Sequence, residues 1–451
     1  MLHVFRQNDI RGVADSELTE SFLKELGNAL AVYFDRHQVA TVSLGYDCRL
    51  SSPRLKTALA EGLLESGINV IDIGMGPTPL VYFSLFHLPV GGGIMITGSH
   101  NPPNENGLKI SLGKTTIYGE EIQAIRRIMA AKDYRNGHGQ YTIHPLISEY
   151  QKYLATITQP GPRRVKAVVD AGNGTGNIAA VELYQSLGWE IVELFSEPDG
   201  NFPNHHPDPT MPENLEALIA AVRQTGADLG IAFDGDADRI GVVDGRGRIL
   251  WGDQLLILFA KELLKEHPGG KIIGEVKCSQ SLFDSITKFG GTPIMWKVGH
   301  SLIKAKMKAE GALLAGEMSG HLFFADRYYG YDDAIYAGAR LLELLSRSEQ
   351  SLAELVEAFP PTVATPEIRF ECPDDRKFTI VAQLIREFES KYPVIAIDGA
   401  RISFPEGWGL VRASNTQPVL VLRFEARTQA ALAAIETEVR RVLARLAASP
   451  C

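Results

Sequence analysis

The residues most able to do chemistry lie in four short polar segments, and the first of these segments surrounds Ser99. It spans residues 97–109 and directly follows the apolar stretch 94–96. The Ser99 hydroxyl can act as a covalent nucleophile, and His100 and Lys109 can transfer protons or offset negative charge. Because Ser, Asn, Pro and Gly are also the usual residues of turns, composition alone leaves a reactive loop and an ordinary turn equally open.

The second segment places aspartates at alternate positions, Asp234, Asp236 and Asp238, after the apolar stretch 229–233. Three carboxylates packed together repel one another unless a cation lies between them, and Mg²⁺ prefers oxygen ligands of this kind. The same spacing begins a calcium-binding EF-hand loop, but Gly245 stands where that loop requires a glutamate. We therefore predict a magnesium site and keep a solvated acidic turn as the alternative, which the preceding strand-like stretch makes the weaker one.

The two remaining segments have compositions that suit a sugar and a phosphate. Residues 316–321 present Glu317 and Ser319 between glycines; a glutamate accepts hydrogen bonds from vicinal hydroxyls, and a serine both donates and accepts. Residues 412–418 combine Arg412 with three short polar side chains and free peptide N–H groups, which is typical of a phosphate-binding loop. Each segment alone is a weak signal, because polar loops between glycines and hairpin connections with an arginine are common.

The elements that must position these segments alternate between helix-like and strand-like patterns. Apolar residues at positions 22, 26, 30, 33 and 34 form one face of a helix, and residues 40–44 have the pattern of a strand. The next helix has Ser52 as its expected N-cap, Pro53 as its first residue and Gly67 at its end. This alternation predicts layers of helices and strands in which the loops after strands carry the chemistry.

The alternating pattern restarts twice and then changes. A second strand-like segment begins at residue 165, after the Pro- and Gly-containing stretch 158–162, and a third begins at residue 272. After Pro360 and Pro361 the chain mixes strands, such as 419–424, with an alanine-rich helix over 429–447. We therefore expect three α/β units followed by a smaller α+β unit, with no repeat of fixed period among them.

The composition is that of a folded globular protein and excludes several classes of function. The 451 residues include 45 basic and 54 acidic ones, a net charge of −9 that provides no basic surface for nucleic acid. We find neither a signal peptide nor the roughly 18 apolar residues of a membrane span, and therefore expect a cytoplasmic protein. Cys48, Cys278, Cys372 and Cys451 lack the spacing of a zinc site or a disulfide framework, so we predict reduced thiols.

Taken in this order, the sequences TGSHNPPNENGLK, DGDADR, GEMSGH and RASNTQP resemble those of the α-D-phosphohexomutase superfamily, in its phosphomannomutase/phosphoglucomutase branch. Shorter matches at residues 9–12, 47–52 and 298–300 extend the resemblance over essentially the whole chain. The resemblance implies an α/β fold in which three related α/β domains with mixed sheets and a smaller C-terminal α+β domain surround a central cleft. We expect a phosphoserine domain, a metal-binding domain, a sugar-binding domain and a phosphate-binding C-terminal domain at residues 1–157, 158–250, 251–361 and 362–451.

The resemblance also assigns roles to individual residues. The catalytic set that it implies is Ser99, as the phosphoserine, with Arg11, His100, Lys109 and Arg239. The implied substrate-binding set is Lys277, His300, Glu317, Ser319, His321, Arg412, Ser414, Asn415 and Thr416. The implied Mg²⁺ ligands are Ser99, through its phosphate, and Asp234, Asp236 and Asp238. The chain departs from the family at Asn8, where a tyrosine is usual, which leaves one contact of the cleft unassigned.

The implied activity is that of a phosphohexomutase, which interconverts hexose 6-phosphates and hexose 1-phosphates of mannose, glucose or both. Phospho-Ser99 and a hexose 1,6-bisphosphate are the expected intermediates, Mg²⁺ the cofactor and the bisphosphate also an activator. We expect a monomer or homodimer with no nucleic-acid or membrane partner. A phosphoglucosamine mutase is the first alternative, although that group usually has Gln where Met318 stands. Two further alternatives are disfavoured because they leave predicted features without a role. A metal-dependent sugar phosphatase would not require a second phosphate site, and a non-enzymatic binding module would require neither the nucleophile nor the three aspartates.

Overall fold

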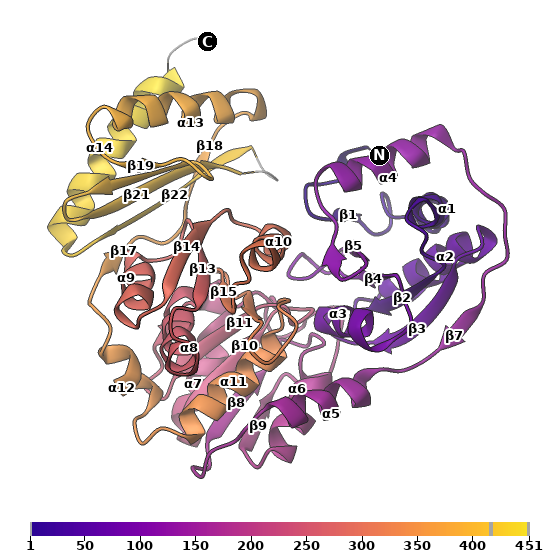
Figure 1. Ribbon diagram of the computed structural model, residues 1–451, viewed down its shortest axis with the longest axis horizontal. Coiled ribbons are helices and arrows are strands. Elements are labelled where there is room, and N and C mark those ends of the chain that lie inside the picture. Colours follow the sequence, from indigo (N-terminus) through magenta and orange to yellow (C-terminus); the bar gives the residue numbers. More distant parts are fainter. Residues whose placement is uncertain (1, 415–417, 449–451) are drawn as a thin grey trace.

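Four β-sheets follow one another along the chain in the computed structural model, which describes residues 2–414 and 418–448. Figure 1 shows them arranged as a crescent in chain order. The N-terminal and C-terminal sheets lie at its two ends, and the second and third sheets lie between them. This arrangement lets loops from successive sheets meet although they are far apart in the sequence.

The first sheet is mixed and has the strand order β1-β5-β4-β2-β3-β7, with β6 paired to β5. Strand β2 pairs in parallel with β3 and β4, whereas β5 runs antiparallel to β4 and β1. The elements of this unit are η1 (Leu2–Val4), β1 (Ile10–Val13), α1 (Glu20–Arg36), β2 (Thr41–Tyr46), α2 (Ser52–Glu65), β3 (Asn69–Met75), α3 (Thr78–His87), β4 (Gly92–Ile96), β5 (Glu105–Leu112), β6 (Thr115–Thr116), α4 (Glu120–Ala131), β7 (Tyr141–Ile143) and α5 (Ile147–Ile157).

The second sheet is also mixed, with the order β12-β11-β10-β8-β9. Strands β9, β8 and β10 are parallel, and β11 then runs antiparallel to β10. The elements of this unit are β8 (Lys166–Asp170), α6 (Asn177–Ser186), β9 (Glu190–Leu194), η2 (Pro212–Leu215), α7 (Glu216–Thr225), β10 (Leu229–Phe233), β11 (Ile240–Asp244) and β12 (Ile249–Leu250).

The third sheet repeats this arrangement with the order β14-β13-β15-β16. Strands β14, β13 and β15 are parallel, and β16 is antiparallel to β15. The elements of this unit are α8 (Gly252–Glu266), β13 (Lys271–Glu275), α9 (Gln280–Lys288), β14 (Thr292–Trp296), α10 (His300–Glu310), β15 (Leu314–Gly316), β16 (Leu322–Phe324), α11 (Ala334–Ser346) and α12 (Leu352–Glu357).

The three predicted reactive loops occupy the same place in these three sheets. Ser99 lies between β4 and β5, Asp234 between β10 and β11, and Glu317 between β15 and β16. In each case the loop leaves the carboxyl end of the last parallel strand and leads into the first antiparallel one. Loops at this edge of an α/β sheet are the ones that commonly bind ligands.

The C-terminal sheet is antiparallel throughout and is covered by two helices. Leu384 and Phe388 of one helix and Val439 of the other share a core with Leu420 and Phe424 of the sheet. The elements are β17 (Val363–Ala364), β18 (Ile368–Glu371), α13 (Asp374–Glu389), β19 (Val394–Ile395), β20 (Ala400–Phe404), β21 (Gly407–Ala413), β22 (Val419–Ala426) and α14 (Gln429–Ala448). The structure therefore confirms the expected α/β fold of three mixed-sheet units and a smaller C-terminal one.

The hydrophobic cores show which units are held together firmly. One continuous core joins Phe83 and Tyr150 of the first unit to Phe233 of the second and Leu256 and Tyr336 of the third. The C-terminal unit has its own core and meets the third unit through a small cluster of Val276, Trp408 and Leu410. The first three reactive loops therefore rest on one packed body, and the C-terminal unit is the separate part. The exact domain limits given above stay predictions.

Most elements expected from periodicity are present, with small shifts at their ends, but the expected cap of α2 is wrong. Ser51, and not Ser52, is the N-cap, and Ser52 is already the first helical residue. The Ser52 hydroxyl instead donates a hydrogen bond to Asp47 Oδ1 at 2.5 Å. A local capping rule could not foresee this partner, because its place is set by the neighbouring loop.

Two further expectations concern membrane-spanning helices and the cysteine thiols. Within the described residues, the structure contains no helix with the length and apolarity that crossing a membrane requires. Cys48, Cys278 and Cys372 are free, as predicted. Cys451 lies outside the described residues.

Candidate active site

Ser99 lies at the centre of the site, held in an unusual backbone conformation. Its φ angle is +49°, a left-handed value that is uncommon for a residue with a side chain and typical of functional positions. The buried hydroxyl lies 2.9 Å from Asp234 Oδ2 and 3.1 Å from His100 Nδ1. The structure therefore brings the first two predicted segments together, as a nucleophile next to a candidate metal site.

The loop that carries Ser99 is shaped by a buried arginine, Arg49. Its guanidinium donates hydrogen bonds at 2.5–2.9 Å to four backbone carbonyls of the loop, those of Ser99, Asn101, Pro102 and Glu105. Asp47 pairs with Arg49 at 3.2 Å and also accepts the N–H group of Gly98 at 3.2 Å. Arg49 and Asp47 thus fix the conformation of the Ser99 loop, a role that their sequence motif alone does not reveal.

The three aspartates of the second loop converge in a fully buried cluster. Oxygen atoms of Asp234, Asp236 and Asp238 lie within 4.8 Å of one another, and each residue is 0% exposed. Burial raises the pKa of Asp234 well above its ordinary value, and repulsion from the other two carboxylates adds to the rise. The cluster is therefore not a solvated acidic turn, because such a turn would lie in water.

Only part of the charge of this cluster is balanced by the described side chains. Lys109 Nζ lies 2.6 Å from Asp236 Oδ2 and also contacts Asp238 Oδ2, and Thr78 Oγ1 donates to Asp236 Oδ2 at 2.5 Å. The other oxygens, Asp236 Oδ1 and Asp238 Oδ1, are buried without a hydrogen-bond partner among the described residues. Three carboxylates, two of them with an unpaired oxygen, and one ammonium fit an oxygen-preferring divalent cation such as Mg²⁺.

A second carboxylate–histidine group, Asp238, His321 and Asp332, also has the spacing of metal ligands. Arg239 Nε donates to His321 Nε2 at 3.0 Å, and a guanidinium can only donate. His321 Nε2 must therefore carry the lone pair and Nδ1 the hydrogen; Nδ1 lies 3.0 Å from Asp332 Oδ2, but the two atoms do not form a hydrogen bond. With this tautomer, His321 has no free lone pair for a metal. We therefore interpret Asp332 as a carboxylate that orients the His321 imidazole, and not as part of a second metal site.

Asp332 is a component of the site that the sequence analysis missed. Its carboxylate is fully buried and lies 2.8 Å from Lys304 Nζ and 3.4 Å from His300 Nδ1, in addition to its contact with His321. No motif marks this aspartate or Lys304 in the sequence. A search for polar residues after strands does not find them, because they lie before α11 and within α10.

Cationic side chains lie close to His100, the neighbour of Ser99. Arg11 Nη1 donates to Asn101 Oδ1 at 2.6 Å, and its Nε pairs with Asp9 at 2.5 Å. Burial, followed by the charges of Arg239, Arg11 and Lys109, holds the pKa of His100 well below its ordinary value. His100 is therefore a neutral imidazole beside Ser99, close to cations that suit a phosphoryl group.

The third loop and Lys277 form a neighbouring part of the site. Glu317 is buried, accepts the N–H group of Gly299 at 2.6 Å and lies 3.9 Å from His321 Nε2. Ser319 is half-buried on the same β15–β16 turn. Burial opposes the charge of Lys277, but Glu275 and Glu367 outweigh it and raise its pKa overall. Lys277 is therefore positively charged beside Glu317.

The fourth segment adds Arg412, which lies at the end of β21 and is close enough to Lys277 to affect its pKa. Ser414 donates its backbone N–H to Val419 O at 3.0 Å. Asn415 and Thr416, the other two predicted phosphate contacts, lie outside the described residues. Asn8, the departure from the family pattern, has a buried Oδ1 without a hydrogen-bond partner among the described residues, and its Nδ2 faces Gly299.

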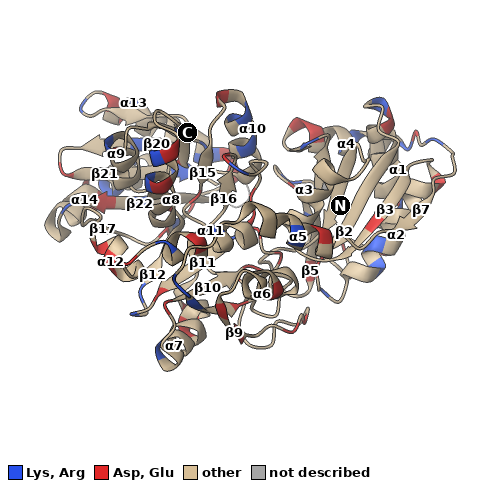
Figure 2. Ribbon diagram, turned by 60° about the horizontal axis from the view of Figure 1, so that its bottom comes forward, with Lys and Arg blue, Asp and Glu red and all other residues tan. Residues whose placement is uncertain are grey.

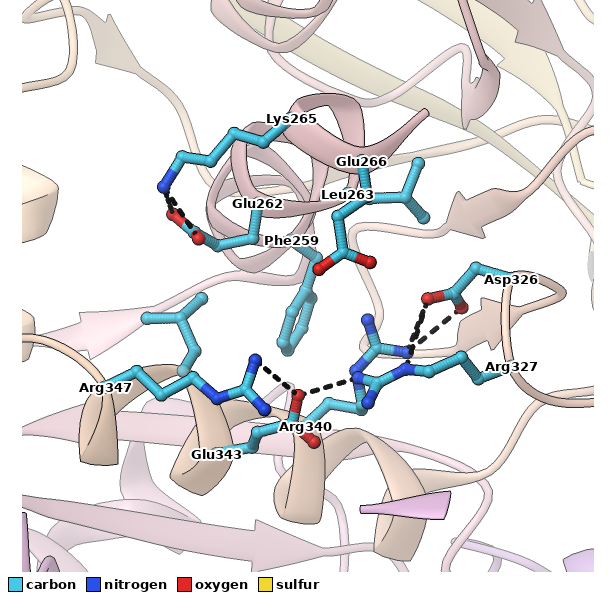
Figure 3. Close-up of a pocket in the computed structure, with 11 residues that line it drawn as sticks. Phe259, Glu262, Leu263, Lys265, Glu266, Asp326, Arg327, Arg340, Glu343 and Arg347 are labelled. Carbon is cyan, nitrogen blue, oxygen red and sulfur yellow. Dashed lines mark hydrogen bonds and ion pairs between the residues drawn. The ribbon is translucent and has the colours of Figure 1, made fainter. Parts of the chain in front are cut away.

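A pocket on another part of the third unit, between α8 and α11, is a weaker candidate for binding a phosphate. Figure 3 shows that its arginines point toward acidic side chains of the same pocket. Arg340 pairs with Asp326 at 3.0 Å and Arg327 with Glu343 at 2.7 Å. These charges already neutralise one another, so the cluster around Ser99 remains the candidate active site.

Comparison with known families covers nearly the whole chain. Residues 2–136, 148–247 and 251–363 match the models of phosphoglucomutase/phosphomannomutase alpha/beta/alpha domains I, II and III, respectively. Residues 367–442 match the model of the phosphoglucomutase/phosphomannomutase C-terminal domain. The four matches follow the order of the four sheets.

Individual relatives are similar over nearly their full length. A phosphomannomutase/phosphoglucomutase of Pseudomonas aeruginosa is 46% identical over 442 residues, which is 98% of this chain and 95% of that protein. A phosphoglucomutase of Neisseria gonorrhoeae is 45% identical over 445 residues, 98% of this chain and 96% of that protein. The crystal structure of a phosphoglucomutase/phosphomannomutase family protein from Burkholderia thailandensis has a TM-score of 0.95 and 42% identity, covering 100% of this chain and 99% of that one.

Proposed function

The chain belongs to the phosphoglucomutase/phosphomannomutase family, and on this premise we propose that it is a phosphohexomutase that uses Ser99 as its phosphoryl carrier. Its substrates are hexose 1-phosphates and hexose 6-phosphates of mannose, glucose or both. The observation that carries the proposal is the contact of 2.9 Å between Ser99 Oγ and the buried aspartate cluster. Ser99, the aspartate cluster and several cations lie close together. Neither an ordinary turn nor a binding protein without catalytic activity would require this combination.

The proposed first step transfers the phosphoryl group from phospho-Ser99 to the free hydroxyl of a hexose monophosphate. The bond between phosphorus and Ser99 Oγ breaks as a bond to the sugar oxygen forms, and the proton of that hydroxyl ends on Ser99 Oγ. Arg11 and Lys109 offset negative charge during this transfer, and neutral His100 lies within 3.1 Å of the serine oxygen. The product is a hexose 1,6-bisphosphate and an unphosphorylated serine.

The reverse transfer completes the isomerisation. The bisphosphate turns end for end, and Ser99 accepts its other phosphoryl group, so no phosphate is gained or lost. Asp234, Asp236 and Asp238 would hold Mg²⁺, which supplies positive charge next to the transferring group when it is bound. Added hexose 1,6-bisphosphate acts as an activator because it rephosphorylates Ser99 after an intermediate has escaped.

The proposed second phosphate site favours a mutase over a phosphatase. A mutase must hold one phosphate while the other reacts, and Lys277 of the third unit and Arg412 of the C-terminal unit supply two cations for this purpose, away from the unit of Ser99. Glu317, which contacts Gly299 and His321, would accept sugar hydroxyls. A phosphoglucosamine mutase remains the second candidate, and Met318 at the tip of the sugar loop argues against it. We place the reaction in the cytoplasm, in a monomer or homodimer.

Replacing Arg412 by alanine is expected to raise the KM for hexose 1-phosphate at least about tenfold, because a charge-assisted hydrogen bond contributes about 1.5–3 kcal/mol. The variant should also depend more steeply on added hexose 1,6-bisphosphate, since the intermediate escapes more often. Steady-state kinetics at several bisphosphate concentrations measures both effects. An unchanged KM with a lowered melting temperature would mean that Arg412 is merely structural.

A further inference from the structure

Asp398, in the turn between β19 and β20, holds Arg412 by one edge of its guanidinium. Its Oδ2 atom lies 3.3 Å from Arg412 Nε, which donates to it, and 3.2 Å from Nη2. The two side chains are only 17% and 10% exposed, so water screens their attraction little. A carboxylate on the Nε–Nη2 edge fixes the plane of a guanidinium as well as its position.

The backbone around Asp398 is built for this close contact. The antiparallel register that pairs Ala400 with Val411 places the next residue, Gly399, beside Arg412. Gly399 has a φ angle of +94°, and a Cβ atom there would lie 2.6 Å from Arg412 Cβ. A residue with a side chain would be strained and would push the arginine away, so glycine keeps the turn with Asp398 against Arg412.

The same carboxylate also reaches across to the third unit. Asp398 Oδ2 accepts the backbone N–H group of Val298 at 3.0 Å, and the next N–H group, that of Gly299, is accepted by Glu317 Oε1 at 2.6 Å. Two successive peptide groups are thus bound by two carboxylates, one from the C-terminal unit and one from the sugar loop. This short segment leads directly into α10, which begins at His300.

We propose that Asp398 is a positioning residue for phosphate recognition: it orients Arg412 and ties it to the loop formed by Val298 and Gly299. The inference rests on the proposed function, in which Arg412 binds the phosphate that is not reacting. Asp398 acts through Arg412 and does not itself touch the substrate. It couples the phosphate-binding arginine to the segment that also holds the sugar-binding Glu317.

A simple electrostatic argument predicts the opposite effect, which makes the proposal testable. A carboxylate near a bound phosphate repels it, so a residue that served no positioning role would weaken phosphate binding, and its removal would improve it. A positioning residue instead improves binding in spite of its charge, because it orients Arg412 before the phosphate arrives. The sign of the change on removing Asp398 therefore separates the two roles.

The test is a double-mutant cycle on glucose 1-phosphate binding, measured by titration calorimetry on the full chain with Asp398→Ala, Arg412→Ala and the double variant. We expect each single substitution to raise the Kd about tenfold or more. The double variant should be no more than about threefold weaker than Arg412→Ala, because Asp398 acts through the arginine. Asp398→Asn, which keeps an acceptor oxygen, should bind more tightly than Asp398→Ala. In turnover assays, Asp398→Ala should raise the KM while kcat changes less than about threefold.

The control is Asp374→Asn, which removes a carboxylate with a 73% exposed side chain from the same unit and should leave the Kd unchanged. Unchanged or tighter binding by Asp398→Ala, or losses that add in the double variant, would overturn the inference. The cycle uses mannose 1-phosphate if the wild type does not bind glucose 1-phosphate, and a wild type that binds neither would also overturn the inference. If the wild type binds either ligand but does not isomerise it, the proposed function fails, while the binding cycle still decides the role of Asp398.

Discussion

The variant Ser99→Ala is expected to lose hexose 1-phosphate turnover by about three orders of magnitude or more while it remains folded. The serine oxygen is the proposed phosphoryl carrier, and alanine offers no atom to replace it. The substitution removes only two hydrogen-bonding contacts, to Asp234 and His100, and a loop hydroxyl contributes little to stability. Steady-state turnover measures the loss, and intact-mass analysis should show a phosphate adduct in the wild-type protein that the variant lacks.

A matched control for this experiment is Ser84→Ala. Ser84 is also a buried serine of the first unit, but its hydroxyl bonds to Ser43 and to the carbonyl oxygen of Val81 in α3. We expect this control to lose about 1 kcal/mol of stability and to keep its turnover and its phosphate adduct. Near-normal turnover of Ser99→Ala would contradict the assignment of the phosphoryl carrier.

Replacing Asp236 by asparagine should abolish the response to Mg²⁺ and, with it, most of the activity. The change removes one of three negative charges that a cation offsets, while asparagine keeps an oxygen that can accept from Lys109 and Thr78. A ligand that binds only the folded state raises the melting temperature. Mg²⁺ should therefore stabilise the wild-type protein and leave the melting temperature of the variant unchanged.

Without metal, the same variant should be at least as stable as the wild type, because repulsion within the buried cluster falls. A suitable control is Glu216→Gln, which removes an exposed carboxylate of the same unit in the first turn of α7. This control should respond to Mg²⁺ as the wild type does. An equal Mg²⁺ response in Asp236→Asn would mean that the aspartate cluster is not the metal site.

The sequence predicts the positions of the Ser99 and Asp234 loops well, because each follows a recognisable apolar strand. The Glu317 loop is indicated by its composition alone, and the structure places all three loops at the same edge of their sheets. Local signals are less reliable where a tertiary contact competes with them. Ser52 illustrates this, since its hydroxyl binds Asp47 from the next loop instead of capping its own helix.

The residues that the sequence analysis missed act through contacts between distant segments. Thr78 meets Asp236 across 158 positions, and Asp398 meets Val298 across 100. Asp332 stands before a helix with no motif of its own, so only the packing of α10 and α11 reveals that it faces two histidines. A single sequence shows which residues follow a strand, but it does not show which side chains converge from different units.

The positions of the charged residues in space likewise cannot be predicted from the sequence alone. In Figure 2, basic and acidic residues are interspersed along the ribbon of the molecule. The cations that matter for phosphate chemistry, Arg11, Lys109 and Lys277, are largely buried beside carboxylates. Their role therefore follows from their partners and not from their number.

Isomerisation of hexose phosphates without release of phosphate can be followed by ³¹P NMR of one reaction mixture. Mannose 1-phosphate or glucose 1-phosphate is incubated with the protein, Mg²⁺ and a trace of the matching hexose 1,6-bisphosphate. We expect the hexose 1-phosphate signal to be replaced by that of the hexose 6-phosphate of the same sugar, with constant total sugar phosphate. Growth of an inorganic phosphate signal in its place, or no conversion of either sugar, would contradict the proposed isomerisation.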